Sequence, residues 1–433
     1  MNKLALFGGK PIISDEKPHV WPIVTEKMED YLITSLRSER LGYSENSVTR
    51  EFEEIFARYH GCHYAIATNS GTSALLLAYF ACGIGSFDGS ESDEVIVPAY
   101  GFFATASPLL YLGAKPVFCD VEPETGNIDA TKIANLITPK TKAIAVTHIA
   151  GHPANMAAIL EIARLYGLKV IEDCSHAHGS CLSNQLVGTF GDIAAFSFQT
   201  GKIISAGEGG IVLTNDKSHL LRISALANFR RLEGLPEEIP SFLEETGLGL
   251  KLRLSPLSAS LALYHLDELE ELIQKRSERL NYLTQGINAI EDKVFMPPIT
   301  KANVTRRSFY EYPIRCLAVE QKRLPLSMIK AALKAEGLVI RHSNTKAIHH
   351  LPLLMMTLPE AYAQLDNFSE TKFTHKNNLS MPEADRLTQI SLTLPTFTTE
   401  PFALIDKYIQ AIEKINRHLP LLEKACEEHP KLL

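Results

Sequence analysis

The sequence predicts an α/β protein in which a large domain, built on a mostly parallel sheet with helices on both faces, precedes a smaller C-terminal α+β domain. Three observations lead to this prediction. Over the first two thirds of the 433 residues, short apolar runs alternate with helix-length segments. The runs are apolar almost without interruption, as expected of parallel strands buried on both faces. After about Leu254 the alternation stops, and a long helical stretch rich in Leu and Glu begins.

Seven apolar runs are the predicted strands of the large domain. Each is too short for a helix and is bounded by turn or polar residues. They cover residues 64–67, 95–97, 116–118, 143–146, 170–171, 194–198 and 210–213. Between them, apolar residues recur at helical spacing, most clearly over 73–81 and 156–166. Alternation of this kind predicts helices on both faces of one sheet.

The change of pattern divides the chain into a large domain (1–254, with an N-terminal arm), a small domain with its linking helix (255–417) and a charged tail (418–433). For the small domain we predict helices over 256–283, 326–336 and 403–415, and strands over 312–316, 338–341 and 390–394. The tail is charged, and we expect it to be mobile.

Composition narrows the class of protein. The 43 basic and 50 acidic residues give a net charge of −7, so we expect no nucleic-acid or membrane partner. No apolar run approaches the roughly 18 residues of a membrane span, and the apolar run at the N-terminus is too short for a signal peptide. The seven cysteines are widely spaced without Cys-x-x-Cys, which favours reduced thiols in the cytoplasm. No histidine spacing indicates a metal site.

Two nucleotide-binding motifs are absent. The stretch ending in Gly201-Lys202 has Phe196 in place of the first Gly of a P-loop and continues with Ile203. The Gly207-Glu208-Gly209-Gly210 turn has Val212 where the dinucleotide fingerprint requires its last Gly, and it precedes a strand instead of following one.

Three groups of residues follow predicted strands, where open α/β sheets bind ligands. Gly71 and Thr72 open a helix and form a candidate phosphate site, or an ordinary helix cap. Glu172 and Asp173 end a strand on opposite faces, so one acid can face a ligand. Lys202 is either a solvated charge or, among small and apolar residues, a nucleophilic amine of lowered pKa. A phosphate cradle, an acid and such a lysine match the needs of pyridoxal phosphate.

With these motifs the chain resembles the sugar aminotransferases of the DegT/DnrJ/EryC1/StrS family, which are fold type I pyridoxal-phosphate enzymes. The resemblance covers residues 6–415. Its motifs are Asn69-Ser70-Gly71-Thr72-Ser73-Ala74-Leu75, Pro98-Ala99-Tyr100-Gly101-Phe102-Phe103-Ala104-Thr105, Gly113-Ala114-Lys115-Pro116-Val117-Phe118, Glu172-Asp173-Cys174-Ser175-His176-Ala177-His178-Gly179 and the segment from Phe196 to Gly210. The opening Phe7-Gly8-Gly9-Lys10-Pro11 is most similar to the branch of aminocyclitol aminotransferases and 3-amino-5-hydroxybenzoate synthase.

The resemblance implies a role for each matching residue. Lys202 binds the cofactor covalently and moves a proton, Asp173 pairs with the pyridine nitrogen, and His176 contacts the ring hydroxyl side. The remaining implied contacts are ring stacking by Phe102, phosphate binding by Gly71, Thr72 and Ser197, phosphate binding across a dimer interface by Asn228 and Lys251, and substrate contact by His349. Arg230, Lys251 and Gly101 depart from the common family pattern.

The resemblance also implies a homodimer with shared active sites. The expected reaction moves an amino group from an amino acid, glutamate or glutamine, to a keto-sugar, a nucleotide-linked keto-sugar or a keto-cyclitol. Two alternatives stay open at this point. Some relatives are dehydratases that keep the cofactor but have His in place of this Lys, and Lys202 argues against that class. A non-catalytic regulatory protein with the same fold is the other.

Overall fold

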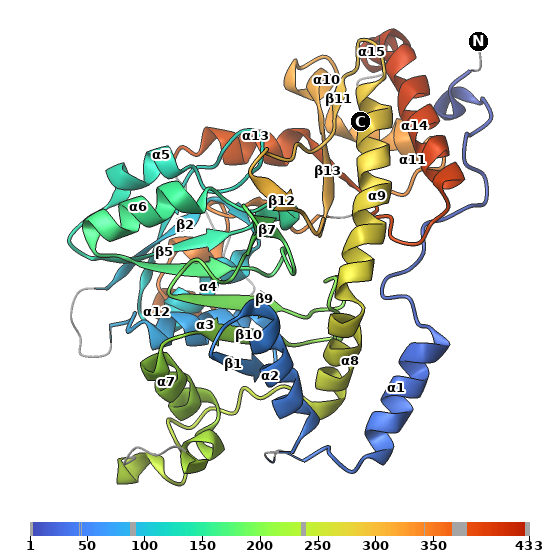
Figure 1. Ribbon diagram of the computed structural model, residues 1–433. Helices are drawn as coiled ribbons and strands as arrows, with labels where there is room; N and C mark the ends of the chain where they lie inside the picture. Colours follow the sequence, from blue (N-terminus) through green and yellow to red (C-terminus); the bar gives the residue numbers. More distant parts are fainter. Residues whose placement is uncertain are drawn as a thin grey trace.

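A seven-stranded sheet lies at the centre of the computed structural model (Figure 1), which describes residues 3–42, 44, 46–86, 92–234, 240–341, 343–365 and 379–428. In spatial order its strands are β1 (Tyr64–Thr68), β10 (Gly210–Thr214), β9 (Ile193–Ser197), β6 (Lys169–Asp173), β5 (Thr141–Thr147), β2 (Glu94–Pro98) and β4 (Lys115–Cys119). All seven predicted apolar runs are strands of this sheet. The last five strands in this order are parallel, whereas β10 runs antiparallel to both of its neighbours. The predicted mostly parallel sheet is therefore confirmed.

Helices cover both faces of the sheet, as predicted. One face carries α3 (Gly71–Ala81), α4 (Ser107–Tyr111) and α7 (Lys217–Ala227), and the other carries α2 (Val48–His60), α5 (Ala130–Ile133), α6 (Met156–Tyr166) and α8 (Pro256–Asp267). Within β2, Val95 and Val97 pack on the first face and Ile96 packs on the second. Because successive side chains are buried on opposite faces, each strand is a continuous apolar run.

The small domain is built on a second sheet. Its elements are β11 (Phe295–Met296), β13 (Tyr312–Cys316), β15 (Ser391–Leu394), α9 (Leu269–Asn288), α10 (Leu317–Glu320), α11 (Leu326–Ala335), α14 (Phe402–Arg417) and α15 (Leu419–Glu428). The helix predicted over 256–283 is two helices, α8 and α9, which meet at Glu268. The strand predicted over 338–341 is wrong, because there only Arg341 pairs, in an isolated bridge with Thr393.

Residues 419–428 of the segment expected to be a mobile tail (418–433) instead form α15, and residues 429–433 lie outside the described residues. Leu419 and Leu422, three residues apart on one side of this helix, are buried in the small-domain core. The segment is charged overall, but its apolar residues fall on one side of the helix. Their burial holds the helix against the core.

Segments on each side of residue 254 pack on the other domain, so the boundary in the sequence is not a boundary in space. Leu4 and Ile13 of the N-terminal arm are buried in the small-domain core. Conversely, β14 (Lys346–Ala347) pairs with β3 (Tyr100–Gly101), and α13 (Pro382–Ile390) packs on the large-domain core through Leu387.

The remaining elements are α1 (Glu26–Arg37), which lies beside α8 in Figure 1, α12 (Leu358–Leu365), β7 (Cys181–Leu182), β8 (Gln185–Leu186) and β12 (Val304–Arg306). Among the described helices, none combines the length and the apolar character needed to cross a bilayer.

Glu336 anchors the N-terminal arm. Its fully buried carboxylate accepts hydrogen bonds from the Ala5 amide (2.9 Å), the Ile12 amide (3.2 Å) and the buried Lys414 ammonium (2.8 Å). Glu336→Gln leaves the Lys414 charge buried without its partner, so we expect urea denaturation to show a loss of about 3–5 kcal/mol in the free energy of unfolding.

Glu413→Gln is the matched control, because Glu413 pairs with Arg417 at the surface and should cost at most about 1 kcal/mol. Equal stability of the two variants would show that Glu336 does not anchor the arm.

Candidate active site

A cavity of about 320 Å³ opens where β6 and β9 end and α3 begins. Seven of the residues selected from the sequence line it: Gly71, Thr72, Phe102, Asp173, His176, Ser197 and Lys202. They come from four segments that are far apart in the sequence. Parallel strands present their carboxyl ends at the same sheet edge, which is why these segments meet.

The start of α3 fits closely against the end of β9. Ser70 caps the helix, because its hydroxyl accepts a hydrogen bond from the Ser73 amide (3.1 Å). A Cβ atom on Gly71 would lie 2.5 Å from the Ser197 Cβ, so only glycine fits at this position. With Ser70 as the cap, the neighbouring Thr72 hydroxyl and the first-turn amides line a helix N-terminus that favours an anion.

Asp173 is the acid that faces the cavity. Its side chain is almost fully buried and accepts hydrogen bonds from the Thr105 hydroxyl (2.7 Å) and the Ser175 amide (3.1 Å). Both donors fix the orientation of the carboxyl group.

Glu172 points to the other face of the sheet, as strand alternation predicts. It accepts hydrogen bonds from the amides of Gly188, Phe190 and Gly191 and lies 3.1 Å from His148 Nε2. His148 Nδ1 accepts a hydrogen bond from the Ala154 amide, so the proton is on Nε2, which donates to Glu172. By distance alone His148, Glu172 and Cys174 could hold a metal ion, but these hydrogen bonds already use the Glu172 oxygens.

Lys202 is buried, with 7% of its surface exposed, in the turn that follows β9. The Lys202 amide donates to the Gln199 carbonyl, and the Lys202 carbonyl accepts from the Trp21 indole (both 2.8 Å). Burial lowers the pKa of the Lys202 amine to about 8, although the charges of Asp173 and Glu311 oppose this shift. A substantial fraction of the amine is therefore neutral, and hence nucleophilic, near neutral pH.

Aromatic side chains form two walls of the cavity. Tyr310 stacks on His176 with ring centroids 4.0 Å apart, and Lys202 Nζ lies 3.8 Å from the centroid of the Tyr310 ring. Burial and the nearby Lys202 charge hold the pKa of His176 well below its usual range, so the ring is neutral. His176 Nδ1 is buried without a hydrogen-bond partner in the described structure. On another wall, Phe102 is 37% exposed and packs against Phe103.

Three of the selected residues do not line the cavity: Asn228, Lys251 and His349. Asn228 caps α7, and its buried Nδ2 has no partner in the described structure. Lys251 is exposed, in a segment whose Leu252 carbonyl accepts from the Asn69 amide (2.9 Å). His349 is fully buried near Phe118 and Asp385, so the expected substrate contact is absent from this cavity.

The sequence did not single out Trp21, Thr105 or Tyr310. Trp21 and Tyr310 come from segments without a chemical motif of their own. Thr105 ends one of the matching motifs, but only the three-dimensional fold shows that it bonds to Asp173. Arg231 forms a buried ion pair with Glu53 that holds the loop after Asn228, whereas the departure at Arg230 has no structural explanation.

Comparisons with known proteins agree with this geometry. The model of the DegT/DnrJ/EryC1/StrS aminotransferase family matches residues 22–393. The L-glutamine:2-deoxy-scyllo-inosose aminotransferase of Micromonospora echinospora is 34% identical over 72% of this chain and 74% of its own length. GDP-perosamine synthase of Caulobacter vibrioides is 37% identical over 61% and 68%. The crystal structure of 3-amino-5-hydroxybenzoic acid synthase is 26% identical, covers 92% of this chain and 98% of that chain, and has a TM-score of 0.74.

A buried lysine and an acid in one cavity beside a helix N-terminus define a fold type I pyridoxal-phosphate enzyme. The chain belongs to the DegT/DnrJ/EryC1/StrS aminotransferase family and is a pyridoxal-phosphate-dependent aminotransferase. The residues present fit the cofactor. The close approach at Gly71 leaves a cradle for phosphate, Asp173 is an acceptor for the ring nitrogen, and the unpartnered His176 Nδ1 is a polar group in the same wall.

The lowered pKa of Lys202 should appear in its reactivity. In the cofactor-free protein, trace labelling with acetic anhydride should give Lys202 a titration midpoint near pH 8, whereas an ordinary lysine titrates at about 10.4. The sign follows from burial, which penalises the ammonium form and leaves the reactive amine above pH 8. Unfolding in urea should move the midpoint up to the ordinary value. A midpoint near 10.4 in the folded protein would refute the assignment.

Proposed function

We propose that Lys202 holds pyridoxal phosphate covalently and that Asp173 pairs with its ring nitrogen. The observation that carries this proposal is the position of buried Lys202 in one cavity with Asp173 and the start of α3. When bound, the cofactor supplies an aldehyde that takes up amino groups and a ring that accepts electrons. Gly71, Thr72 and Ser197 would hold its phosphate.

The chain's own residues account for positioning and proton transfer. Asp173, held by Thr105 and Ser175, presents an ionised oxygen, and a hydrogen bond to such a group contributes about 1.5–3 kcal/mol. Phe102 would stack on the ring, and His176 would contact the side of the ring that carries the hydroxyl group. Nζ of Lys202 would take the proton from the α-carbon of the amino donor and pass it to the aldehyde-derived carbon of the cofactor. In the second half-reaction it would carry a proton in the opposite direction, from that carbon to the acceptor.

The names of the relatives support a substrate class. One relative uses L-glutamine with 2-deoxy-scyllo-inosose, and another makes GDP-perosamine. We propose glutamine or glutamate as amino donor and a keto-cyclitol or keto-sugar, free or nucleotide-linked, as acceptor. A screen of these acceptors against the aminated form of the enzyme separates the classes by their rates.

A homodimer in the cytoplasm is the proposed working form. Large apolar side chains are exposed on α1 and α8 (Ile33, Leu36, Leu257) and again at Phe242 and Leu248, and such exposure is typical of protein interfaces. Phosphate contacts from Asn228 and Lys251 of a second copy would explain why neither lines the cavity of its own chain. The cysteines are free, which agrees with a reducing compartment.

The attachment of the cofactor is tested by chemical trapping. Borohydride reduction of the holoenzyme followed by peptide mapping should mark Lys202. Lys202→Ala should lose the mark and lower turnover by about 10²–10⁴-fold or more. Lys334→Ala, at an exposed position of α11, is the control and should change neither result. A mark on another lysine, with Lys202→Ala fully active, would sink the proposal.

Shared sites are tested by mixing subunits. Lys202→Ala chains are combined with Asn228→Ala/Lys251→Ala chains, each inactive or impaired alone. If phosphate contacts cross the interface, mixed dimers contain one site with intact Lys202 from one chain and intact Asn228 and Lys251 from the other. Random assortment then restores about a quarter of wild-type activity, since half of the dimers have one good site of two. No recovery, although heterodimers form, would place these contacts within one chain.

A further inference from the structure

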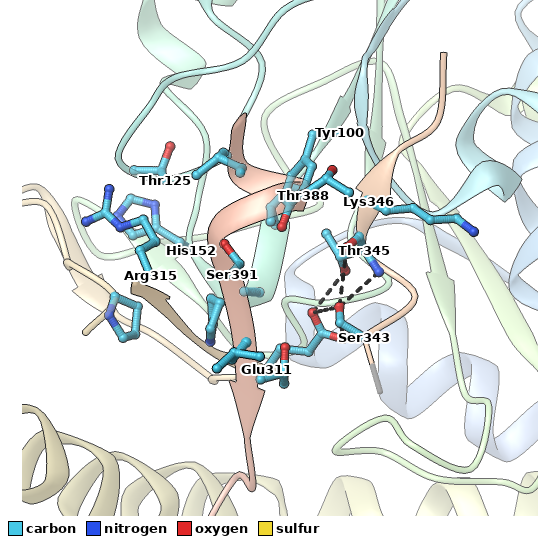
Figure 2. Close-up of a pocket in the computed structure, with 18 of the residues that line it drawn as sticks. Tyr100, Thr125, His152, Glu311, Arg315, Ser343, Thr345, Lys346, Thr388 and Ser391 are labelled. Carbon is cyan, nitrogen blue, oxygen red and sulfur yellow. Dashed lines mark hydrogen bonds between the residues drawn. The ribbon is translucent and has the colours of Figure 1, made fainter. Parts of the chain in front are cut away.

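A second cavity, of about 220 Å³, lies between the two domains (Figure 2). Large-domain loops contribute Tyr100, Thr125 and His152, and the small domain contributes Glu311, Arg315 and Ser391, among others. Thr345 lines both this cavity and the cofactor cavity. Tyr310 and Glu311, adjacent in sequence, line the cofactor cavity and the second cavity respectively.

The lining of this cavity is rich in positive charge. Arg307, Arg315, Arg341, Lys330 and Lys346 line it, and none of these five forms a salt bridge within the part of the chain that the structure describes. Arg315 instead donates to the Pro123 carbonyl (3.0 Å). A cavity with cations of one sign and low-dielectric walls concentrates anions.

The lining contains two acidic residues, Glu124 and Glu311, against these five cations. Glu124 is exposed at the rim. Glu311 accepts hydrogen bonds from the hydroxyls of Ser343 (3.1 Å) and Thr345 (2.9 Å), drawn as dashed lines in Figure 2, and burial raises its pKa. His152 adds no charge, because it donates from Nδ1 to the Pro153 carbonyl and accepts at Nε2 from the Lys301 amide.

Arg307 is the clearest example of a cation in this lining that has no negatively charged partner. Its side chain is buried, with 6% of the residue exposed, and its partners are uncharged: the Ile299 carbonyl (2.8 Å), the Thr300 hydroxyl (3.4 Å) and the Ala150 carbonyl (3.4 Å). Its Nε has no hydrogen-bond partner in the described structure. A buried guanidinium without a counter-charge is costly, so an anion in the adjoining cavity would stabilise it.

We propose that this interdomain cavity is a binding site for a small oxyanion, a carboxylate or a phosphate, distinct from the cofactor's phosphate site. Guanidinium groups match both anions through paired hydrogen bonds. The walls come from both domains, so the bound anion links them. Thr345 lines both cavities and so connects the two sites.

Calorimetric titration of the holoenzyme tests this site, with inorganic phosphate and succinate as separate probes. The holoenzyme is used because its own phosphate cradle is then filled. We expect saturable binding of at least one probe, and the tighter one identifies the preferred oxyanion. Lys330→Gln and Arg341→Gln should each weaken it about tenfold, the effect of losing one charged hydrogen bond.

The matched control is Arg323→Gln, which removes a cation paired with Glu423 outside the cavity and should leave affinity unchanged. Lys330 is exposed on α11. Lys330→Gln therefore still tests the affinity of the cavity for the probe if Arg341→Gln folds poorly. The proposal is overturned if neither probe binds, if Lys330→Gln binds as well as the wild type, or if the probe competes with the amino donor and so occupies the cofactor cavity. None of these outcomes depends on the identity of the sugar or cyclitol acceptor.

Discussion

The close contact between the start of α3 and the ends of β9 and β10 is the constraint on which the site depends. A Cβ on Gly71 would strike Ser197, and a Cβ on Gly210 would lie 2.4 Å from the Ser70 carbonyl oxygen. Two glycines therefore let a helix N-terminus reach the edge of the sheet directly beside the turn that holds Lys202. The anion-binding end of the helix and the nucleophile are positioned by the same packing.

Burial around this contact sets the chemistry of the side chains. Lys202 and His176 lose most of their solvent, and both pKa values fall as a result. Asp173 stays in place because Thr105 and Ser175 supply the hydrogen bonds that water would otherwise provide. Behind it, Glu172 and His148 complete their own hydrogen bonds within the second face of the sheet. The reactive groups are thus held by neighbours that take no part in the reaction.

Much of this arrangement can be predicted from sequence, for a physical reason. Strands buried on both faces must be continuously apolar, so 95–97 or 143–146 are visible without a structure, and the polar residues that follow them fall at one edge. Lys202, Asp173 and Gly71 are found in this way. Trp21, Thr105 and Tyr310 are not, because their role depends on tertiary contacts across the chain. The errors have similar causes: residues 338–341 form only one bridge with a partner strand, and Leu419 and Leu422 are apolar positions in a charged segment.

The route of the N-terminal arm has a consequence for the order in which the chain folds. Lys414 Nζ donates to the Lys10 carbonyl (3.0 Å), across 404 positions, and Leu4 shares a core with Leu422. Contacts of such long sequence separation form slowly, so we expect the arm to dock after the large domain, whose contacts are shorter in sequence. Trp21, which bonds to the Lys202 carbonyl, follows this arm, so docking of the arm also completes the surroundings of the lysine turn.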